Sequence, residues 1–284
     1  MGSSCCKTEA TEVEVVSRRD PRLSCRRDTP DHRDLHLEFP AKSDTVVDLR
    51  PYESFPVFTQ GFLASCTANA LSAAYHFSMR KQLGDGCDFT PSRLFIWYNE
   101  RAQEGLTDQN AGTMLRDGIK VLHKLGVCSE DMWPYILHYS GGVPQWRQKP
   151  SQECYDQAAK CKVEGYARVA QDVESLKNCL RNGFPFIFLM VVLDSFMGAE
   201  LAKTGAMAMP QPGDRIRGSH ALVAVGFDEA KRTFLIRNSW GEEWGDRGYF
   251  HMPYGYICCP LLTCDFWVIN WVQPFSEAKQ KSLT

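Results

Sequence analysis

Three residues that lie far apart in the chain could together perform nucleophilic chemistry: Cys66, His220 and Asn238. A cysteine thiolate is a strong nucleophile, and it needs a nearby imidazole as base and counter-charge. The imidazole needs a third polar group to fix its tautomer and orientation. Taken singly, these residues would be interpreted as a packed thiol, a core histidine and a turn former. Taken together, they predict a reactive thiol whose partners face it across a cleft.

The sequence around Cys66 predicts the start of a helix. Small residues together with Leu71 and Phe77 recur at helical spacing after the cysteine. Ser65 can serve as the N-cap, which places Cys66 on the first turn. The positive end of the helix dipole lies there, and it favours a thiolate over a thiol.

The remaining elements divide into a helical part and a part rich in strands. Further helices are expected at 90–105, with Thr90 as N-cap and Pro91 at the first position, at 114–125, and after Asp172 up to Gly183. Strands are expected at 186–192, 220–227, 233–237, 248–252 and 266–271. This order predicts an α+β fold with a helical subdomain at about 45–140, a β-rich subdomain at about 150–275 and a cleft between them.

Composition excludes several classes of protein. The chain has 284 residues, of which 44% are hydrophobic and 23% charged, as in an ordinary soluble protein. A net charge of −2 gives no reason to expect nucleic acid as a partner. The longest apolar run, 184–193, suits a buried strand better than a membrane span. The first residues lack the apolar region of a secretory signal.

The twelve cysteines are expected to be reduced thiols, because no secretory signal accompanies them. Cys258, Cys259 and Cys264 raise the alternative of a zinc site. A second Cys or His pair at ligand spacing is missing from the sequence, so packed thiols are the better interpretation. We expect neither a metal nor a cofactor.

The two ends of the chain differ from its body. Residues 1–44 mix Arg and Asp without a period and predict a disordered or loosely docked extension, and 276–284 predict a tail. Gly2, Cys5 and Cys6 resemble a signal for myristoylation and palmitoylation, although Cys6 stands where Ser or Thr is usual. The other interpretation is an ordinary terminus or a cloning remnant. Acylation would place a cytoplasmic protein on the cytoplasmic face of a membrane.

The chain resembles the papain-like cysteine peptidases, the cathepsin-like C1 family, from about Val46 to Trp271. The resemblance rests on four motifs in the family order. They are Gln60-Gly61 followed by Ser65-Cys66, then Ser219-His220-Ala221, then Asn238-Ser239-Trp240-Gly241, and then Trp244 to Phe250. The stretch from Gly112 to Lys120 is similar to a branch found among bacterial, viral and protist members.

The resemblance implies a two-subdomain fold, with a helical left half and an antiparallel, barrel-like right half. It implies that Cys66 is the nucleophile, that His220 is its base and that Asn238 orients His220. Gln60 would contribute to the oxyanion hole with the backbone N–H of Cys66. Three further residues would bind or shield the substrate region: Gly112, Ala221 and Trp240.

The expected activity is hydrolysis of peptide or protein substrates through an acyl-enzyme. Two alternatives stay open: a catalytically silent protein that binds peptides at a membrane, and acyl transfer to an acceptor other than water. Leu63, Ala64 and Thr67 depart from the secreted members, which fits a reducing compartment. The extension is shorter than the usual inhibitory prodomain. One hypothesis is that the Arg-rich residues 17–33 lie across the cleft.

Overall fold

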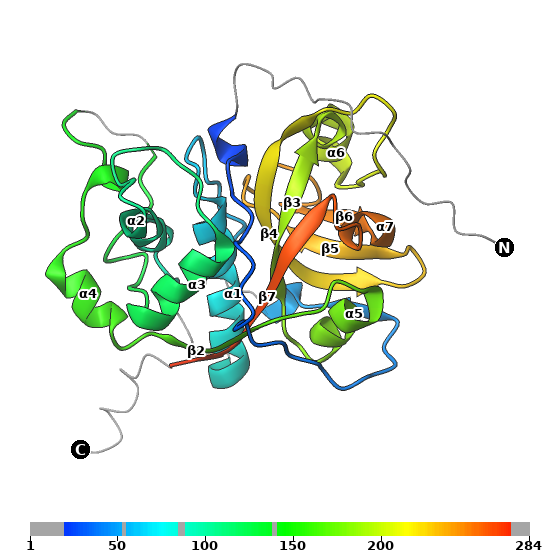
Figure 1. Cartoon of the computed structure of the whole chain (residues 1–284), viewed down its shortest axis with the longest axis horizontal. Helices are drawn as coiled ribbons and strands as arrows, with labels where there is room; N and C mark the ends of the chain where they lie inside the picture. The colour runs from blue at the N-terminus through cyan, green and yellow to red at the C-terminus, as the bar shows by residue number, and fades with distance from the viewer. Residues whose placement is uncertain (1–19, 53–54, 85–88, 138–140, 274–284) are drawn as a thin grey trace.

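The computed structural model of the protein describes residues 20–52, 55–84, 89–137 and 141–273. α2 and α3 lie on one side of the long helix α1, and an antiparallel sheet lies on its other side (Figure 1). The expected α+β class is confirmed. The helices are α1 (Cys66–Leu83), α2 (Arg93–Gln103), α3 (Leu115–Lys124), α4 (Gln152–Ala158), α5 (Val173–Arg181), α6 (Ala199–Thr204) and α7 (Tyr254–Ile257). Within the described ranges, none of the helices is long and apolar enough to cross a membrane.

The helix-capping residues predicted from the sequence are confirmed in part. Asp172 caps α5 with its carboxylate, as predicted. The predicted N-cap of α2, Thr90, is wrong. The cap is Ser92, whose hydroxyl accepts a hydrogen bond from the backbone N–H of Phe95 at 3.1 Å. Pro91 lies before the helix and forms a β-bridge with a distant residue instead, because pairing of the chain with another segment outweighs the local helix signal.

The strands form one antiparallel sheet in the order β2-β7-β3-β4-β5-β6, and β1 pairs with β4. The strands are β1 (Val46–Asp48), β2 (Val163–Arg168), β3 (Phe186–Leu193), β4 (Ile216–Asp228), β5 (Thr233–Arg237), β6 (Tyr249–Pro253) and β7 (Thr263–Val272). All five predicted strands are present. The long strand β4 pairs with β3 on one side and with β5 on the other, and it is buried from His220 to Phe227.

Several elements were not predicted, and one of them, β1, belongs to the sheet although it falls in the part of the sequence expected to be helical. β1 falls in the range 45–140 that was expected to be helical, yet it pairs with β4 of the sheet. β2 has a glycine at its centre and is a strand because it pairs with β7. α6 and α7 have six and four residues, too few for a helical period to show in the sequence.

The N-terminal segment, which we define as residues 20–36, lies between the two halves of the molecule. In Figure 1 it is the dark blue chain that passes between α3 and β7. The prediction that 1–44 form a disordered extension is therefore wrong for 20–44, where the structure is described. Leu23 and Cys25 are 4% exposed and join the core. They are separated by polar residues, so the sequence pattern did not reveal that they are buried.

Backbone pairing fixes the N-terminal segment to both halves. Ser24 forms a β-bridge with Ser219 in β4. Arg26 forms one with Met114, the N-cap of α3, and its N–H donates to the carbonyl of Thr113 at 3.0 Å. These contacts join residues that are distant in sequence, which is the kind of ordering that a local pattern cannot predict.

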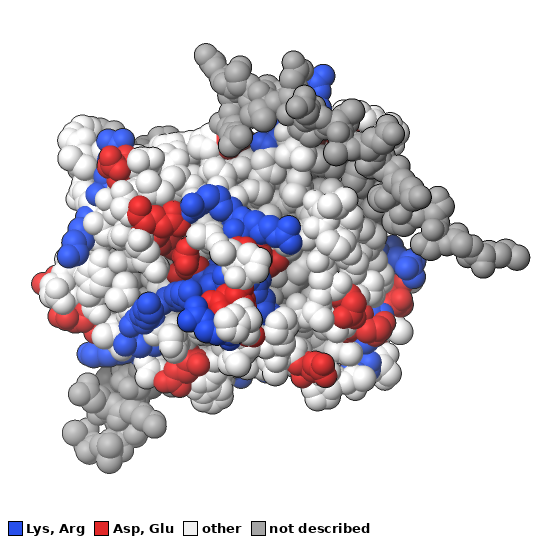
Figure 2. All heavy atoms as spheres, viewed as in Figure 1, with Lys and Arg blue, Asp and Glu red and all other residues white. Residues whose placement is uncertain are grey.

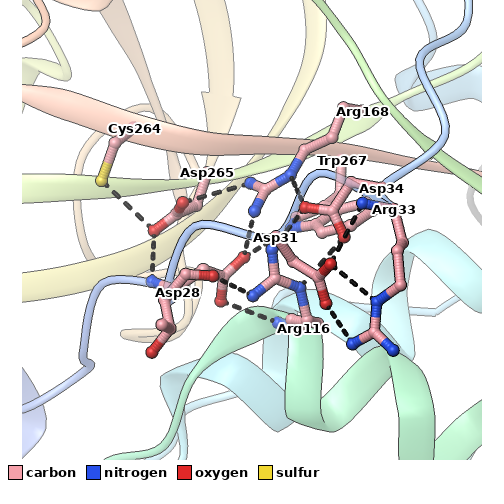
Figure 3. A network of polar contacts seen from close by, with 10 residues as sticks. Asp28, Asp31, Arg33, Asp34, Arg116, Arg168, Cys264, Asp265 and Trp267 are labelled. Atoms are coloured by element: carbon pink, nitrogen blue, oxygen red, sulfur yellow. Dashed lines mark hydrogen bonds and ion pairs between the residues drawn. The ribbon is translucent and has the colours of Figure 1, made fainter.

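A network of ion pairs anchors the end of the N-terminal segment (Figure 3). The Arg168 guanidinium of β2 contacts Asp28 at 2.9 Å, Asp34 at 3.0 Å and Asp265 at 3.1 Å. Arg116 of α3 pairs with Asp34 as well. Figure 2 shows acidic and basic side chains gathered over the middle of the face where the segment runs in Figure 1. Of the charges that suggested a solvated extension, Arg26, Asp28 and Asp34 pair with the body of the protein, and others pair within the segment. Undocking would leave buried charges without partners, which is costly.

Candidate active site

Cys66 is the first residue of α1, as predicted, and its side chain has 0% exposure. Ser65 occupies the N-cap position, but its hydroxyl is hydrogen-bonded to the Tyr135 hydroxyl at 2.6 Å. Hydrogen bonds from the Cys25 thiol and from His220 lower the pKa of Cys66 well below its ordinary value, although burial acts in the opposite direction. These hydrogen bonds favour the thiolate of Cys66 over the thiol.

His220 of β4 and Asn238, which follows β5, meet beside Cys66. Nε2 of His220 lies 2.9 Å from Oδ1 of Asn238, which fixes the ring. Among the described residues, Nδ1 of His220 has no nitrogen or oxygen partner, so this atom is available to exchange a proton with the Cys66 sulfur. The Trp240 ring lies 5.2 Å from the imidazole, centroid to centroid, and covers it. The structure thus brings together the three residues that the sequence singled out.

Gln60 is fully buried, and its amide is held at both ends. Its Oε1 accepts a hydrogen bond from the Ser239 hydroxyl at 2.7 Å, and its Nε2 donates to the carbonyl of Leu63 at 2.7 Å. These two bonds determine which end of the amide carries the hydrogens. One Nε2 hydrogen is left over. The backbone N–H of Cys66 lies on the first turn of α1, where backbone donors lack an acceptor within the helix.

Gly112 and Ala221 also lie where the N-terminal segment passes. A Cβ atom on Gly112 would come 2.1 Å from the carbonyl oxygen of Ser24, so only glycine fits there. The carbonyl of Gly112 accepts a hydrogen bond from the Arg26 side chain at 3.2 Å. Ala221 is 2% exposed, and its backbone hydrogen-bonds the Cys66 sulfur. The peptide backbone that approaches Gly112 in this structure belongs to the same chain.

Two buried residues at the site were not predicted. Cys25 contacts Cys66 directly, and the hydrogen bond to Cys66 together with burial raises the pKa of Cys25 well above its ordinary value. Glu100 of α2 accepts hydrogen bonds from the hydroxyls of Thr67 and Thr113, each at 2.8 Å, and burial raises its pKa to about 8. Glu100 therefore ties the first turn of α1 to the residue beside Gly112. The helical pattern of α2 gives no sign of this role of Glu100. Cys25 does fall within residues 17–33, which were hypothesised to lie across the cleft.

The three residues predicted to carry acyl chains, Gly2, Cys5 and Cys6, lie outside the described residues.

Comparison with known proteins identifies the family of the chain. The papain family cysteine protease model matches residues 51–265. The chain is 40% identical over 270 residues to an uncharacterized peptidase C1-like protein of Acanthamoeba polyphaga mimivirus, covering 86% of this chain and 85% of that protein. It is 28% identical to the thiol protease aleurain of Arabidopsis thaliana, over 74% of this chain and 55% of that protein.

Among solved structures, the crystal structure of xylellain, a cysteine protease from Xylella fastidiosa, superposes with a TM-score of 0.82. It is 42% identical, and the match covers 90% of this chain and 98% of that one. Procathepsin B from Trypanosoma congolense, with 14% identity and a TM-score of 0.65, shares the fold. The family match, these relatives and the arrangement of Cys66, His220 and Asn238 lead to one conclusion: the chain belongs to the papain family of cysteine proteases.

Proposed function

We propose that the protein hydrolyses peptide bonds with the Cys66 thiolate as nucleophile and His220 as its base. The observation that carries the proposal is the placement of His220 between Cys66 and Asn238, with Nε2 held by Asn238 at 2.9 Å and Nδ1 free for the thiol. The thiolate attacks the peptide carbonyl, and His220 gives its proton to the departing amine. Water then attacks the acyl-enzyme with His220 as base, and Cys66 is released.

The oxyanion of each tetrahedral intermediate would be bound by the free Nε2 hydrogen of Gln60 and the backbone N–H of Cys66. Both donors are fixed before substrate arrives, since Gln60 is bonded at both ends of its amide and Cys66 is part of a helix. Such preorganised donors stabilise the charge that develops in the transition state without a cost of reorganisation.

We further propose that the protein is latent while the N-terminal segment is docked. The segment starts beside Trp240, where Arg22 lies 4.8 Å from the ring, and runs past Cys66 to Gly112. A substrate would place its leaving amine near His220, so its chain would run in the direction opposite to that of the N-terminal segment. The Cys25 carbonyl is bonded to the Ser219 hydroxyl rather than to Gln60. These two features support a segment that occupies the site without being cleaved.

A labelling experiment tests the proposed activity. A peptidyl epoxide should add once to the protein under reducing conditions near neutral pH, as seen by intact-mass spectrometry. The Cys66→Ala protein should show no adduct, and a chain that begins at Ala41 should react faster than the full chain. An unlabelled Cys66 in both chains would mean that the thiol and imidazole are not paired, and the protein would then be a binding protein.

Latency should depend on pH in two steps. Burial and the neighbouring Asp265 raise the pKa of Asp28, so protonation of Asp28 favours the docked state as pH falls from neutral. Burial tends to raise the pKa of Asp34, but hydrogen bonds from Arg116 and Arg168 outweigh this effect and lower the pKa. The docking free energy from Asp34 is therefore present above its undocked pKa, near 3.9, and is lost below it.

The measurement for this prediction is the ratio of peptidase rates of the full chain and the chain beginning at Ala41, since the pH dependence of catalysis cancels in it. The ratio should fall somewhat as pH decreases from 7 toward about 4.5 and rise toward one below about pH 3.9. A ratio that stays constant over this range would show that these two carboxylates do not control docking.

We also propose, from the sequence alone, that Gly2 is myristoylated and that Cys5 or Cys6 is palmitoylated, which would hold the protein on the cytoplasmic face of a membrane. Intact mass after expression in a eukaryotic host tests this. Gly2→Ala should remove the myristoyl mass, and a wild-type protein without added mass would exclude the acylation.

A further inference from the structure

The N-terminal segment places a second thiol against the nucleophile. Cys25 and Cys66 are 4% and 0% exposed, and their two thiols lie close enough to interact, while the Cys25 thiol also donates to the carbonyl of Arg26 at 3.9 Å. Neither of these two cysteines takes part in a disulfide in this structure. Cys25 of the N-terminal segment thus lies against Cys66, which is the thiol that this segment covers.

Backbone contacts on either side hold Cys25 in this position. Ser24 is bridged to Ser219, the residue before His220, and Arg26 is bridged to Met114 beyond Gly112. The carbonyl of Cys25 itself is bonded to the Ser219 hydroxyl. Cys25 is thus fixed from both halves of the molecule, directly over the start of α1.

We propose that Cys25 and Cys66 form a disulfide when the protein meets a hydroperoxide, and that this bond locks the N-terminal segment over the active site. The proposal rests on the proposed function, because it names a regulation of the same thiol. It turns docking from an equilibrium, from which the segment can leave, into a covalent closure that only a reductant reverses.

The chemistry requires a hydroperoxide as oxidant and proceeds in two steps. In an undocked molecule, the Cys66 thiolate attacks the terminal oxygen of the hydroperoxide. The S–O bond forms, the O–O bond breaks, and an alcohol (water, for hydrogen peroxide) leaves with a proton from His220. When the segment docks, the Cys25 sulfur attacks the sulfenic sulfur of Cys66. The S–S bond forms, the S–O bond breaks, and hydroxide leaves as water with the Cys25 proton. Two thiols lose two electrons in total, which the hydroperoxide gains.

A second thiol pair in the same protein separates proximity from reactivity. Cys128 and Cys154 are also buried and close enough for their thiols to interact, and the Cys154 thiol donates to the carbonyl of Met132 at 3.8 Å. Burial and the neighbouring Cys154 raise the pKa of Cys128, so the thiolate of Cys128 is disfavoured. We therefore expect this pair to stay reduced under conditions that join Cys25 to Cys66.

The test is to treat the reduced full chain with a small excess of hydrogen peroxide, block free thiols and map the peptides without reduction. A linked Cys25–Cys66 peptide is expected, with loss of peptidase activity and its return on adding dithiothreitol. Cys25→Ser should lose activity too, but recover about tenfold less, because its sulfenic acid has no resolving thiol and is oxidised further to irreversible forms. Cys154→Ser is the matched control and should behave like wild type.

The proposal is overturned if Cys66 appears as sulfinic acid or is linked to a different cysteine, or if Cys25→Ser recovers as well as wild type. The peptide map does not depend on activity, so the two proposals can fail separately. A linked peptide in a protein that never hydrolyses peptides would support the disulfide and overturn the proposed peptidase activity. An active protein without the linked peptide would support the activity and overturn the disulfide.

Discussion

A chain that begins at Ala41 is expected to hydrolyse a peptide substrate about 100-fold faster than the full chain at pH 7, provided that the docked segment is about 99% populated. The reason is that only undocked molecules can bind substrate, because Cys25 lies on Cys66 and Ser24 lies on Gly112. The apparent rate of the full chain is then the rate of the open enzyme multiplied by the undocked fraction. The measurement is kcat/KM of both chains under reducing conditions, with the concentration of active sites taken from epoxide labelling.

Removal of the N-terminal segment also removes partners of Arg168, so the shortened chain could fail for lack of stability. The substitution Leu23→Asp in the full chain is a second variant, in which these carboxylates stay in the chain. Leu23 is 4% exposed between the two halves, and a carboxylate there should expel the segment and raise activity. Leu35→Asp is the matched control, since Leu35 belongs to the same segment and is 71% exposed. Equal activity of the full chain, the shortened chain and the Leu23→Asp protein would rule out latency.

Local signals in the sequence predicted those parts of the site that depend on local structure. Cys66 could be placed on the first turn of a helix because a capping residue, Ser65, precedes it and small residues at helical spacing follow it. His220 could be placed on a buried strand because the residues after it are apolar. The order of the motifs then joined Cys66, His220, Asn238 and Gln60 into one site, and the structure places them together.

The parts that were missed depend on contacts between distant residues. The capping residue of α2 was misplaced because Pro91 pairs with Ser129, which no local pattern shows. Residues 20–44 were expected to be loosely docked because their charges have no period. Their partners, among them Arg116 and Arg168, are far away in the sequence. A segment with paired charges and a solvated one have the same composition, so only the tertiary structure distinguishes them.

Replacing Gln60 with alanine is expected to lower kcat by about 100- to 1,000-fold with little change in KM, because one of two oxyanion donors is lost. The loss should appear only in reactions that develop an oxyanion. Alkylation of Cys66 by iodoacetamide develops none, so its rate should be the same in wild type and in Gln60→Ala. Both measurements belong in the Leu23→Asp background, in which the site is open.

Ser239→Ala gives this prediction a matched control, because the Ser239 hydroxyl holds Oε1 of Gln60 at 2.7 Å without reaching the reacting atoms. Its removal leaves the amide donor in place but no longer fixes which way the amide faces, so we expect a loss of about tenfold, smaller than that for Gln60→Ala. If Gln60→Ala slows alkylation as much as hydrolysis, the side chain acts on the thiolate or on folding. The oxyanion would then depend on the Cys66 N–H alone. If alkylation is unchanged and hydrolysis falls in the expected order, the effect of Gln60 lies in the transition state of acyl transfer.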